Sequence, residues 1–128
     1  MNKVDLKNRT KKFAVDTIHF VNELPKSKAN DVVSYQLLKS ATSVAANYRS
    51  ALRGRSTAEF ASKLNIVLEE SDESQFWLEI LEETNSKIDS ETLKKLLNES
   101  NELTAIFASS IKTVRNNSNK SQILYQKS

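Results

Sequence analysis

The chain has 128 residues but only one glycine, Gly54, and one proline, Pro25. Sheet proteins use glycine and proline at many tight turns, because these residues adopt or favour the backbone angles that sharp reversals require. Long helices joined by short loops need very few such residues. The sequence therefore predicts an all-α protein.

Apolar residues recur every three or four positions in four segments of the chain, which is typical of amphipathic helices. The expected helices cover about residues 5–24, 30–53, 57–85 and 90–116. Short connections between them make consecutive helices antiparallel, so we expect an up-down-up-down four-helix bundle. A chain of this length favours a single domain over residues 1–128. The polar tail, residues 117–128, is expected to fray or to dock on a neighbour through Ile123, Leu124 and Tyr125.

Residues at the expected helix ends support these boundaries. Proline disfavours helical geometry in the residue before it, small polar side chains cap helix starts, and glycine commonly follows a helix end. The signals are Pro25 after the first helix, Asn30 or Asp31 at the start of the second, Gly54 after it, and a capping box of Ser56 and Glu59 at the start of the third.

The sequence also indicates the cellular compartment. There is no cysteine, which excludes disulfides and thiolate chemistry and fits a reducing compartment. The N-terminus is charged and lacks the apolar centre of a signal peptide. No apolar run approaches the ~20 residues of a membrane-spanning helix. We expect a cytoplasmic protein without a membrane partner.

Charge is unevenly distributed along the chain. Residues 1–55 hold eleven Lys and Arg against four Asp and Glu, whereas residues 56–99 hold four against eleven. Such segregation favours charge complementarity within or between chains at least as much as it favours a nucleic-acid partner.

The third expected helix has two apolar faces. At 100° per residue, one stripe forms the bundle core: Phe60, Leu64, Val67, Ser71, Ser74, Leu78 and Leu81. The opposite face and its flanks carry Ile66, Phe76, Trp77 and Ile80, interleaved with Glu69, Glu70 and Glu73. One bundle cannot cover the outer face of its own helix, so we expect this face to contact another chain. The alternative is that these are ordinary exposed apolar residues.

Carboxylates in such a contact need partners, because an unpaired buried charge is costly. The second helix offers Lys39, Arg49 and Arg53 beside the small residues Thr42 and Ala46. Small side chains let another helix approach closely, and an arginine fork suits a carboxylate. We expect the three glutamates to pair with these cations, either within the bundle or across a subunit boundary.

Catalytic and metal sites find little support in the sequence. A di-iron bundle needs two Glu-x-x-His motifs, and this chain has a single histidine, His19. There is no second histidine to act as a base, no nucleophile elbow and no glycine-rich phosphate loop. We expect no enzymatic activity, no catalytic or metal-binding residues and no cofactor.

Basic residues cluster in two places that could hold phosphates without reading sequence. The candidates are Lys7, Arg9, Lys11 and Lys12 on the first helix, and Arg53 and Arg55 around the connection between the second and third helices. The alternative reading is that these side chains provide solubility and ion pairs with residues 56–99. No recognised DNA- or RNA-reading motif is present.

Several short motifs together resemble a known family over roughly residues 13–81. They are Leu24-Pro25, Gln36-Leu37-Leu38-Lys39-Ser40-Ala41-Thr42-Ser43, Asn47-Tyr48-Arg49, Arg55-Ser56 and Glu59-Phe60. This pattern is similar to that of the four-helix-bundle proteins encoded by intervening sequences within bacterial 23S ribosomal RNA genes. Other members have Glu-Gly after the asparagine where this chain has Arg49-Ser50-Ala51, so any role of that Glu-Gly does not transfer.

The resemblance implies a four-helix bundle that assembles into a homopentamer. It also implies similarity to the accessory protein of diversity-generating retroelements, a basic pentamer that binds nucleic acid and a reverse transcriptase. We therefore expect a non-enzymatic scaffold or accessory factor that binds itself and RNA or DNA. The alternative is a protein–protein adaptor, for a reverse transcriptase or another protein, that binds no nucleic acid.

Overall fold

The computed structural model describes the backbone of residues 2–88 and 90–127, and side chains of residues 2, 5–88 and 90–117. Its four helices are α1 (Lys3–Asn22), α2 (Lys28–Ala51), α3 (Thr57–Thr84) and α4 (Ser90–Lys127). The described part of the chain contains no strand, so the all-α prediction is confirmed. No helix in these ranges is long and apolar enough to cross a membrane.

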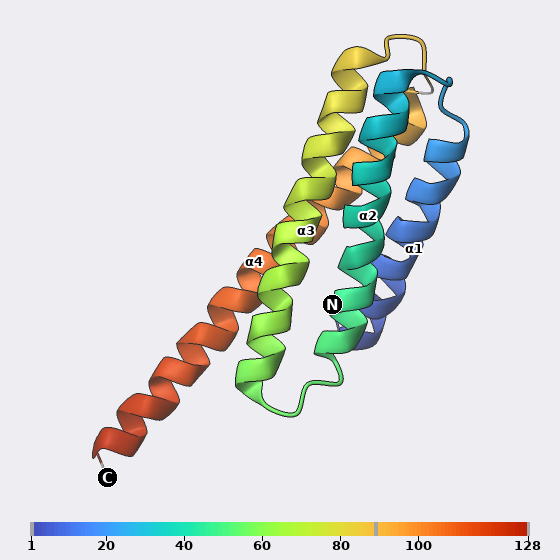
Figure 1. Ribbon diagram of the computed structural model, residues 1–128. Helices are drawn as coiled ribbons and strands as arrows, with labels where there is room; N and C mark the ends of the chain where they lie inside the picture. The colour runs from blue at the N-terminus through green and yellow to red at the C-terminus, as the bar shows by residue number, and fades with distance from the viewer. Residues whose placement is uncertain (1, 89, 128) are drawn as a thin grey trace.

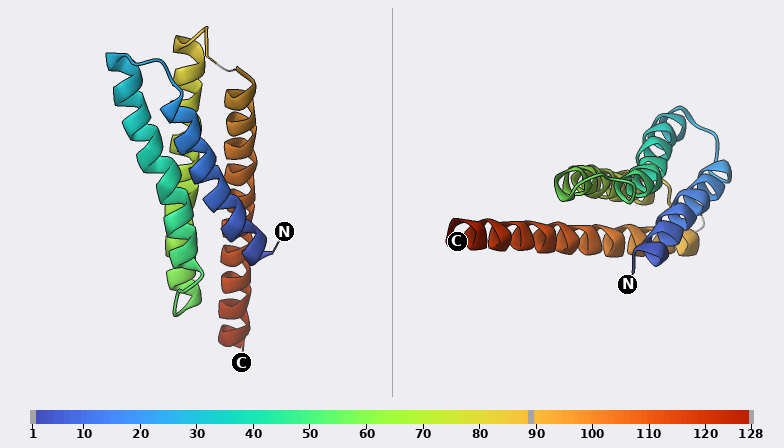
Figure 2. Two further views of the ribbon diagram at one scale, coloured as in Figure 1. Left: turned by 90° about the vertical axis from the view of Figure 1, so that its right-hand side faces the viewer. Right: turned by 90° about the horizontal axis from the view of Figure 1, so that it is seen from below.

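The helices form the expected antiparallel bundle (Figure 1). Each helix contacts its two neighbours around the bundle, and α1 packs more sparsely on α4 than on α2. Across the diagonals of the bundle, no Cα atoms of the described residues lie within 8 Å of each other, and the Tyr48 ring on α2 meets the Phe107 ring on α4 at a centroid distance of 5.6 Å. The view from below in Figure 2 shows the start of α1 crossing α4, and the C-terminal part of α4 extending past the other helices.

The core lies where the helical periodicity predicts it. On α3, the side chains from Leu64 to Leu81 on the predicted stripe are buried, and only Phe60 is half-buried. They pack against Leu37 and Phe107, which have no exposed surface. Each fully buried leucine or phenylalanine of this kind contributes roughly 1.5–3 kcal/mol of stability.

Small hydroxyl side chains let the central helices approach closely. Ser74 Oγ donates to Ser40 Oγ at 2.9 Å between α3 and α2, and Ser71 lies 2.8 Å from Thr104 Oγ1 on α4. All buried side-chain nitrogen and oxygen atoms of the described residues have hydrogen-bond partners. The serine pair also fixes the register of α2 against α3.

The start of α2 differs from the prediction. Ser27, not Asn30 or Asp31, is its N-cap, and Ser27 Oγ accepts from the Asn30 N–H at 3.0 Å. The Asn30 side chain is buried and exchanges two amide hydrogen bonds with Asn85, at 2.9 and 3.0 Å. The Asn30 side chain therefore makes a tertiary contact with Asn85 and does not cap the helix.

The start of α3 confirms the capping prediction with one change. Ser56 Oγ accepts from the Glu59 N–H at 3.1 Å. The Glu59 carboxylate accepts from the N–H of Arg55 at 3.0 Å, one residue before the cap. Both contacts hold the connection between α2 and α3 in a defined shape.

Gly54 follows the end of α2 as predicted, but its φ is not positive, so it does not form a left-handed cap. Close approach of neighbouring backbone favours glycine there instead. A Cβ atom at Gly54 would lie 3.1 Å from the Ala51 carbonyl oxygen and 3.2 Å from the Phe60 nitrogen. The missing side chain lets the end of α2 meet the first turn of α3.

The last helix is longer than expected. It continues to Lys127, past the expected end near residue 116, and projects beyond the bundle (Figure 1). No glycine or proline follows residue 116 to stop a helix. The expected docking of Ile123, Leu124 and Tyr125 concerns side chains outside the described residues.

Candidate functional site

A basic groove runs between α1 and α2. Its volume is about 510 Å³, and it is lined by Lys7, Asn8, Lys11, Thr42, Ala45, Ala46 and Arg49. Alanine and threonine side chains form a shallow floor, and the lining includes three cations and no carboxylate. The groove therefore presents positive charge around a surface that another molecule can approach closely.

The same two helices carry an exposed apolar patch further along. Val15 and Ile18 continue the Lys7–Lys11 side of α1, with 40% and 38% of their surface exposed. Tyr35, which is 65% exposed, and half-buried Leu38 continue the Thr42 side of α2. We call the groove and this patch together the α1–α2 face. The position of Ile18 at 100° per residue falls on this outer side of α1.

The outer side of α3 combines carboxylates with aromatic rings. Glu69 and Glu73 are exposed, and Phe76 retains 49% of its surface. The Phe76 and Trp77 rings meet edge to face, with centroids 4.9 Å apart, and Trp77 Nε1 donates to Glu73 at 3.3 Å. Half-buried Trp77 packs against the edge of the core. We call this surface, with Ile66 and Ile80, the outer α3 face.

Glu70 lies on the flank of this face that is turned toward α2. Desolvation raises the pKa of its carboxyl, and the nearby charges of Glu73 and Glu69 raise it further. Lys39 on α2 acts in the opposite direction and lowers the pKa. The carboxylates thus repel one another more than the single nearby lysine compensates.

The expected ion pairs of the glutamates are not formed within the chain. No salt bridge among the described residues joins Glu69, Glu70 or Glu73 to a cation of α2. Arg49 lies nine positions beyond Ser40, roughly 13 Å along the helix axis from the serine pair and about 6 Å beyond the level of Glu69. Lys39 is close enough to lower the pKa of Glu70 but forms no salt bridge with it. Arg49 instead joins Lys7 and Lys11 around the groove. Pairing across a subunit boundary stays a prediction.

Two of the six candidate phosphate-binding residues are engaged in ion pairs. Arg9 donates to both carboxylate oxygens of Glu99 on α4, at 2.7 and 2.6 Å, and also contacts Glu102. These carboxylates raise the pKa of Arg9, chiefly through the Glu99 hydrogen bond. Lys12 pairs with Asp16 at 2.6 Å.

The other four candidates gather at one end of the bundle. Arg53 and Arg55 are exposed in the connection between α2 and α3, and Lys7 and Lys11 line the nearby groove. The antiparallel arrangement brings them together, because the end of α2 lies beside the start of α1 (Figure 1). No salt bridge of the described residues involves any of these four side chains.

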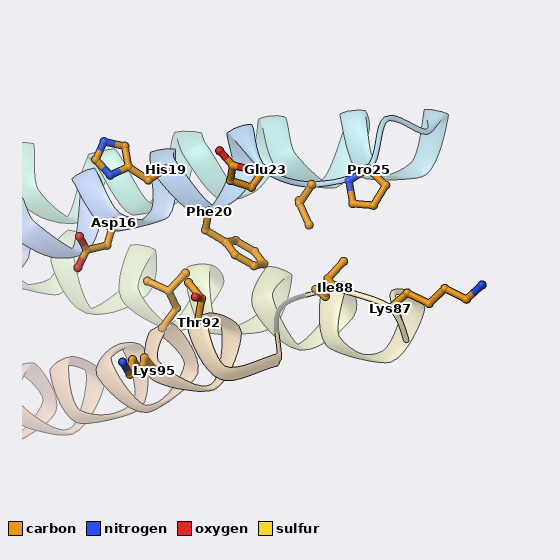
Figure 3. Close-up of a pocket in the computed structure, with 11 residues that line it drawn as sticks. Asp16, His19, Phe20, Glu23, Pro25, Lys87, Ile88, Thr92 and Lys95 are labelled. Atoms are coloured by element: carbon orange, nitrogen blue, oxygen red, sulfur yellow. The ribbon is translucent and has the colours of Figure 1, made fainter.

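A second, more apolar groove opens between the end of α1 and the start of α4, with a volume of about 440 Å³. Figure 3 shows the Phe20 ring projecting between the two helices toward Thr92 and Ile88, whereas Lys87 points away. His19 and Glu23 line its α1 side. Sequence periodicity did not indicate this groove, because it depends on the spacing of two helices far apart in the chain.

Groups of three or more His, Cys, Asp or Glu side chains arranged to hold a metal ion are absent from the described residues. The groove between α1 and α2 is cationic, and the groove between α1 and α4 is more apolar.

Comparison with known proteins gives two findings. A family model described as 23S rRNA-intervening sequence protein matches residues 2–109. A solved structure of a protein with unknown function, from the S23 ribosomal protein family of Bacteroides thetaiotaomicron, is 36% identical with a TM-score of 0.78. That similarity covers 88% of this chain and 99% of the other. A search of curated proteins gave no match.

Proposed function

The chain belongs to the 23S rRNA-intervening sequence protein family, and from this premise we propose that it is a non-enzymatic, homo-oligomeric scaffold or accessory factor. It acts in the cytoplasm, as a pentamer, and binds the phosphate backbone of RNA or DNA through basic surface. Exposed Arg53 and Arg55, which form no salt bridge among the described residues, carry this proposal.

The argument starts from the α2–α3 connection. Arg53 and Arg55 are exposed there, and the contacts of Ser56 and Glu59 hold the connecting backbone in place. Arginine side chains hold phosphates through planar, charge-assisted hydrogen bonds. Such contacts depend on charge and carry no base sequence information.

Oligomerisation strengthens a weak contact of this kind. Two arginines per subunit provide little affinity alone, but several subunits on one strand act at high effective concentration. Each neutralised phosphate on single-stranded nucleic acid adds about 0.7 to the slope of log K against log salt. Affinity should therefore fall steeply as salt rises.

The test is binding of a generic single-stranded RNA, followed by fluorescence anisotropy at several salt concentrations. Arg53→Gln with Arg55→Gln should weaken binding at low salt at least tenfold and reduce the salt slope by about 1.4 for each engaged subunit. Lys94→Gln with Lys95→Gln is the matched control, since it removes two exposed cations from α4. Equal losses in both variants would mean that only net charge matters and would contradict the proposed site.

A second candidate function is the adaptor. Exposed Phe76, which stacks on Trp77, favours it, because an exposed aromatic patch commonly marks a protein contact. This reading predicts no salt-dependent RNA binding by the wild-type protein. It also predicts that Phe76→Ser abolishes binding to a different protein, such as a reverse transcriptase, without changing the mass of the oligomer.

A further inference from the structure

The exposed large apolar side chains gather on two surfaces. Val15, Ile18 and Tyr35 lie on the α1–α2 face, Ile66 and Phe76 lie on the outer α3 face, and exposed Val32 on α2 belongs to neither surface. On each surface a charged stretch adjoins an apolar stretch, and Ile66 lies apart from both, eight positions before Ser74 and beyond Glu69. The charges are opposite, with lysine and arginine on the first and glutamate on the second.

The order of the stretches can be compared by height along the bundle. The hydrogen bond between Ser40 and Ser74 marks one level shared by α2 and α3. Glu73 and Glu69 lie one and five positions before Ser74, about 1.5 and 7.5 Å toward the α2–α3 connection. Thr42 and Ala46, which line the basic groove, lie about 3 and 9 Å from that level in the same direction.

The apolar stretches match on the other side of this level. Phe76 and Ile80 lie two and six positions after Ser74, about 3 and 9 Å away from the connection. Leu38 and Tyr35 lie two and five positions before Ser40, about 3 and 7.5 Å in that direction. Both surfaces therefore change from charged to apolar at the same height.

We propose that the outer α3 face of one copy docks along the α1–α2 face of a second copy, with the two bundles pointing in the same direction. Glu69 and Glu73 then lie level with Thr42 and Ala46, in the groove that Lys7 and Lys11 line. Phe76 and Ile80 cover Val15, Ile18 and Tyr35. The opposite direction places carboxylates on aliphatic side chains, which is unfavourable because a desolvated charge needs a partner.

This contact is heterologous, since each copy offers two different surfaces on different sides of the bundle. Repeating such a contact around an axis closes a ring. The inference rests on the proposed homo-oligomer and adds its orientation and its contact residues. In that ring every α2–α3 connection faces the same way, and Arg53 and Arg55 stay free while the groove lysines are covered.

Cross-linking tests the direction, because the chain contains no cysteine of its own. Lys7 and Ala46 both line the groove, and the level of Ala46 is within about 1.5 Å of that of Glu69 in the proposed contact. The variant Lys7→Cys with Glu69→Cys should form a ladder of covalent oligomers on mild oxidation. A disulfide needs Cα atoms within about 7 Å. Because no Cα atoms of α1 and α3 lie within 8 Å of each other in the described chain, a disulfide between these positions joins two copies.

The control is Lys7→Cys with Ile80→Cys, which cross-links only if the copies run in opposite directions. A ladder from this variant, and none from the first, would overturn the proposed orientation. Protection of Lys7→Cys from cross-linking by single-stranded RNA would assign the groove to nucleic acid and would also overturn the proposal.

Charge reversal gives a second test. Glu69→Lys with Glu73→Lys should reduce the mass measured by light scattering to that of one chain. Adding Lys7→Glu and Lys11→Glu in the same chain should restore the oligomer. A wild-type oligomer that neither cross-links nor responds to charge reversal would refute this contact and leave the oligomer standing. A monomeric wild type would refute the proposed oligomer as well.

Discussion

The two sides of the bundle are held together by different forces. Between α2, α3 and α4 the contact is dry, with Leu37 and Val67 fully buried and with Ser40 and Ser74 sharing a hydrogen bond. Between α1 and α4 the contact consists of the ion pairs of Arg9 at one level and an open apolar groove around Phe20 at another. Ion pairs therefore hold α1 against α4, where apolar packing is sparse.

This difference predicts how each side responds to conditions. Hydrophobic burial depends little on ionic strength, whereas partly exposed ion pairs weaken when salt screens them. The α2–α3 side should therefore set the overall stability, and the α1–α4 side should make that stability sensitive to salt.

The largest expected effect is on the dry side. Leu37→Ala should lower the free energy of unfolding by about 2–5 kcal/mol, because it removes transfer energy and leaves a cavity. Leu24→Ala is the matched control, since half-buried Leu24 lines the open groove and should cost about 1 kcal/mol. Urea denaturation followed by circular dichroism measures both. Equal losses would show that the two sides are packed alike.

A smaller effect is expected for the ion pair. Arg9→Met should cost about 1–2 kcal/mol, between the values typical of exposed and buried pairs, because Arg9 and Glu99 side chains are 21% and 26% exposed. Lys12→Met, which removes an exposed pair with Asp16, should cost less than about 0.5 kcal/mol. Thermal melts in 1 M salt should show a lower stability for the wild type and a nearly unchanged stability for Arg9→Met. If the stability of Arg9→Met still falls with salt as the wild type's does, this role of Arg9 is wrong.

The smallest expected effect concerns the negative charge of Glu70 on the α2–α3 side, where that charge destabilises the fold. Burial and neighbouring carboxylates raise the pKa of Glu70 in the folded chain, so folding favours its protonated form. The penalty is present at neutral pH and disappears as the pH falls through the raised pKa toward 4.5. Glu70→Gln should therefore stabilise the single chain at pH 7 by less than about 1 kcal/mol, since solvent screens most of the charge.

That gain should vanish near pH 4, which thermal melts at matched pH can check. The comparison needs concentrations at which the mass is that of one chain, because a lysine from a second copy would reverse the sign. A gain at pH 7 that persists unchanged at pH 4 would show that Glu70 acts through its shape and not its charge.

Sequence periodicity was sufficient to predict most of the fold. The stripe from Leu64 to Leu81 on α3 is buried as predicted, because every core position recurs at helical spacing along one element. The capping box at Ser56 was equally predictable, since its partners lie three residues apart. Local spacing determines both features.

The features that sequence periodicity did not predict have one physical cause: each depends on a residue or helix far away in the chain. Arg9 resembled a free phosphate ligand until α4 brought Glu99 against it, ninety residues away. Asn30 resembled a cap, but Asn85 takes its side chain. The grooves depend on helix spacing and register, and no pattern within one helix encodes these.

The separation of Arg9 and Glu99 also has a kinetic consequence. The α2–α3 contact needs only a short connection to close, whereas the Arg9–Glu99 contact closes a loop of ninety residues and loses correspondingly more chain entropy. Contacts between distant residues form more slowly than local ones. The α2–α3 hairpin should therefore form early in folding, and α1 should pack against α4 late. In unfolding, α1 should separate from α4 early.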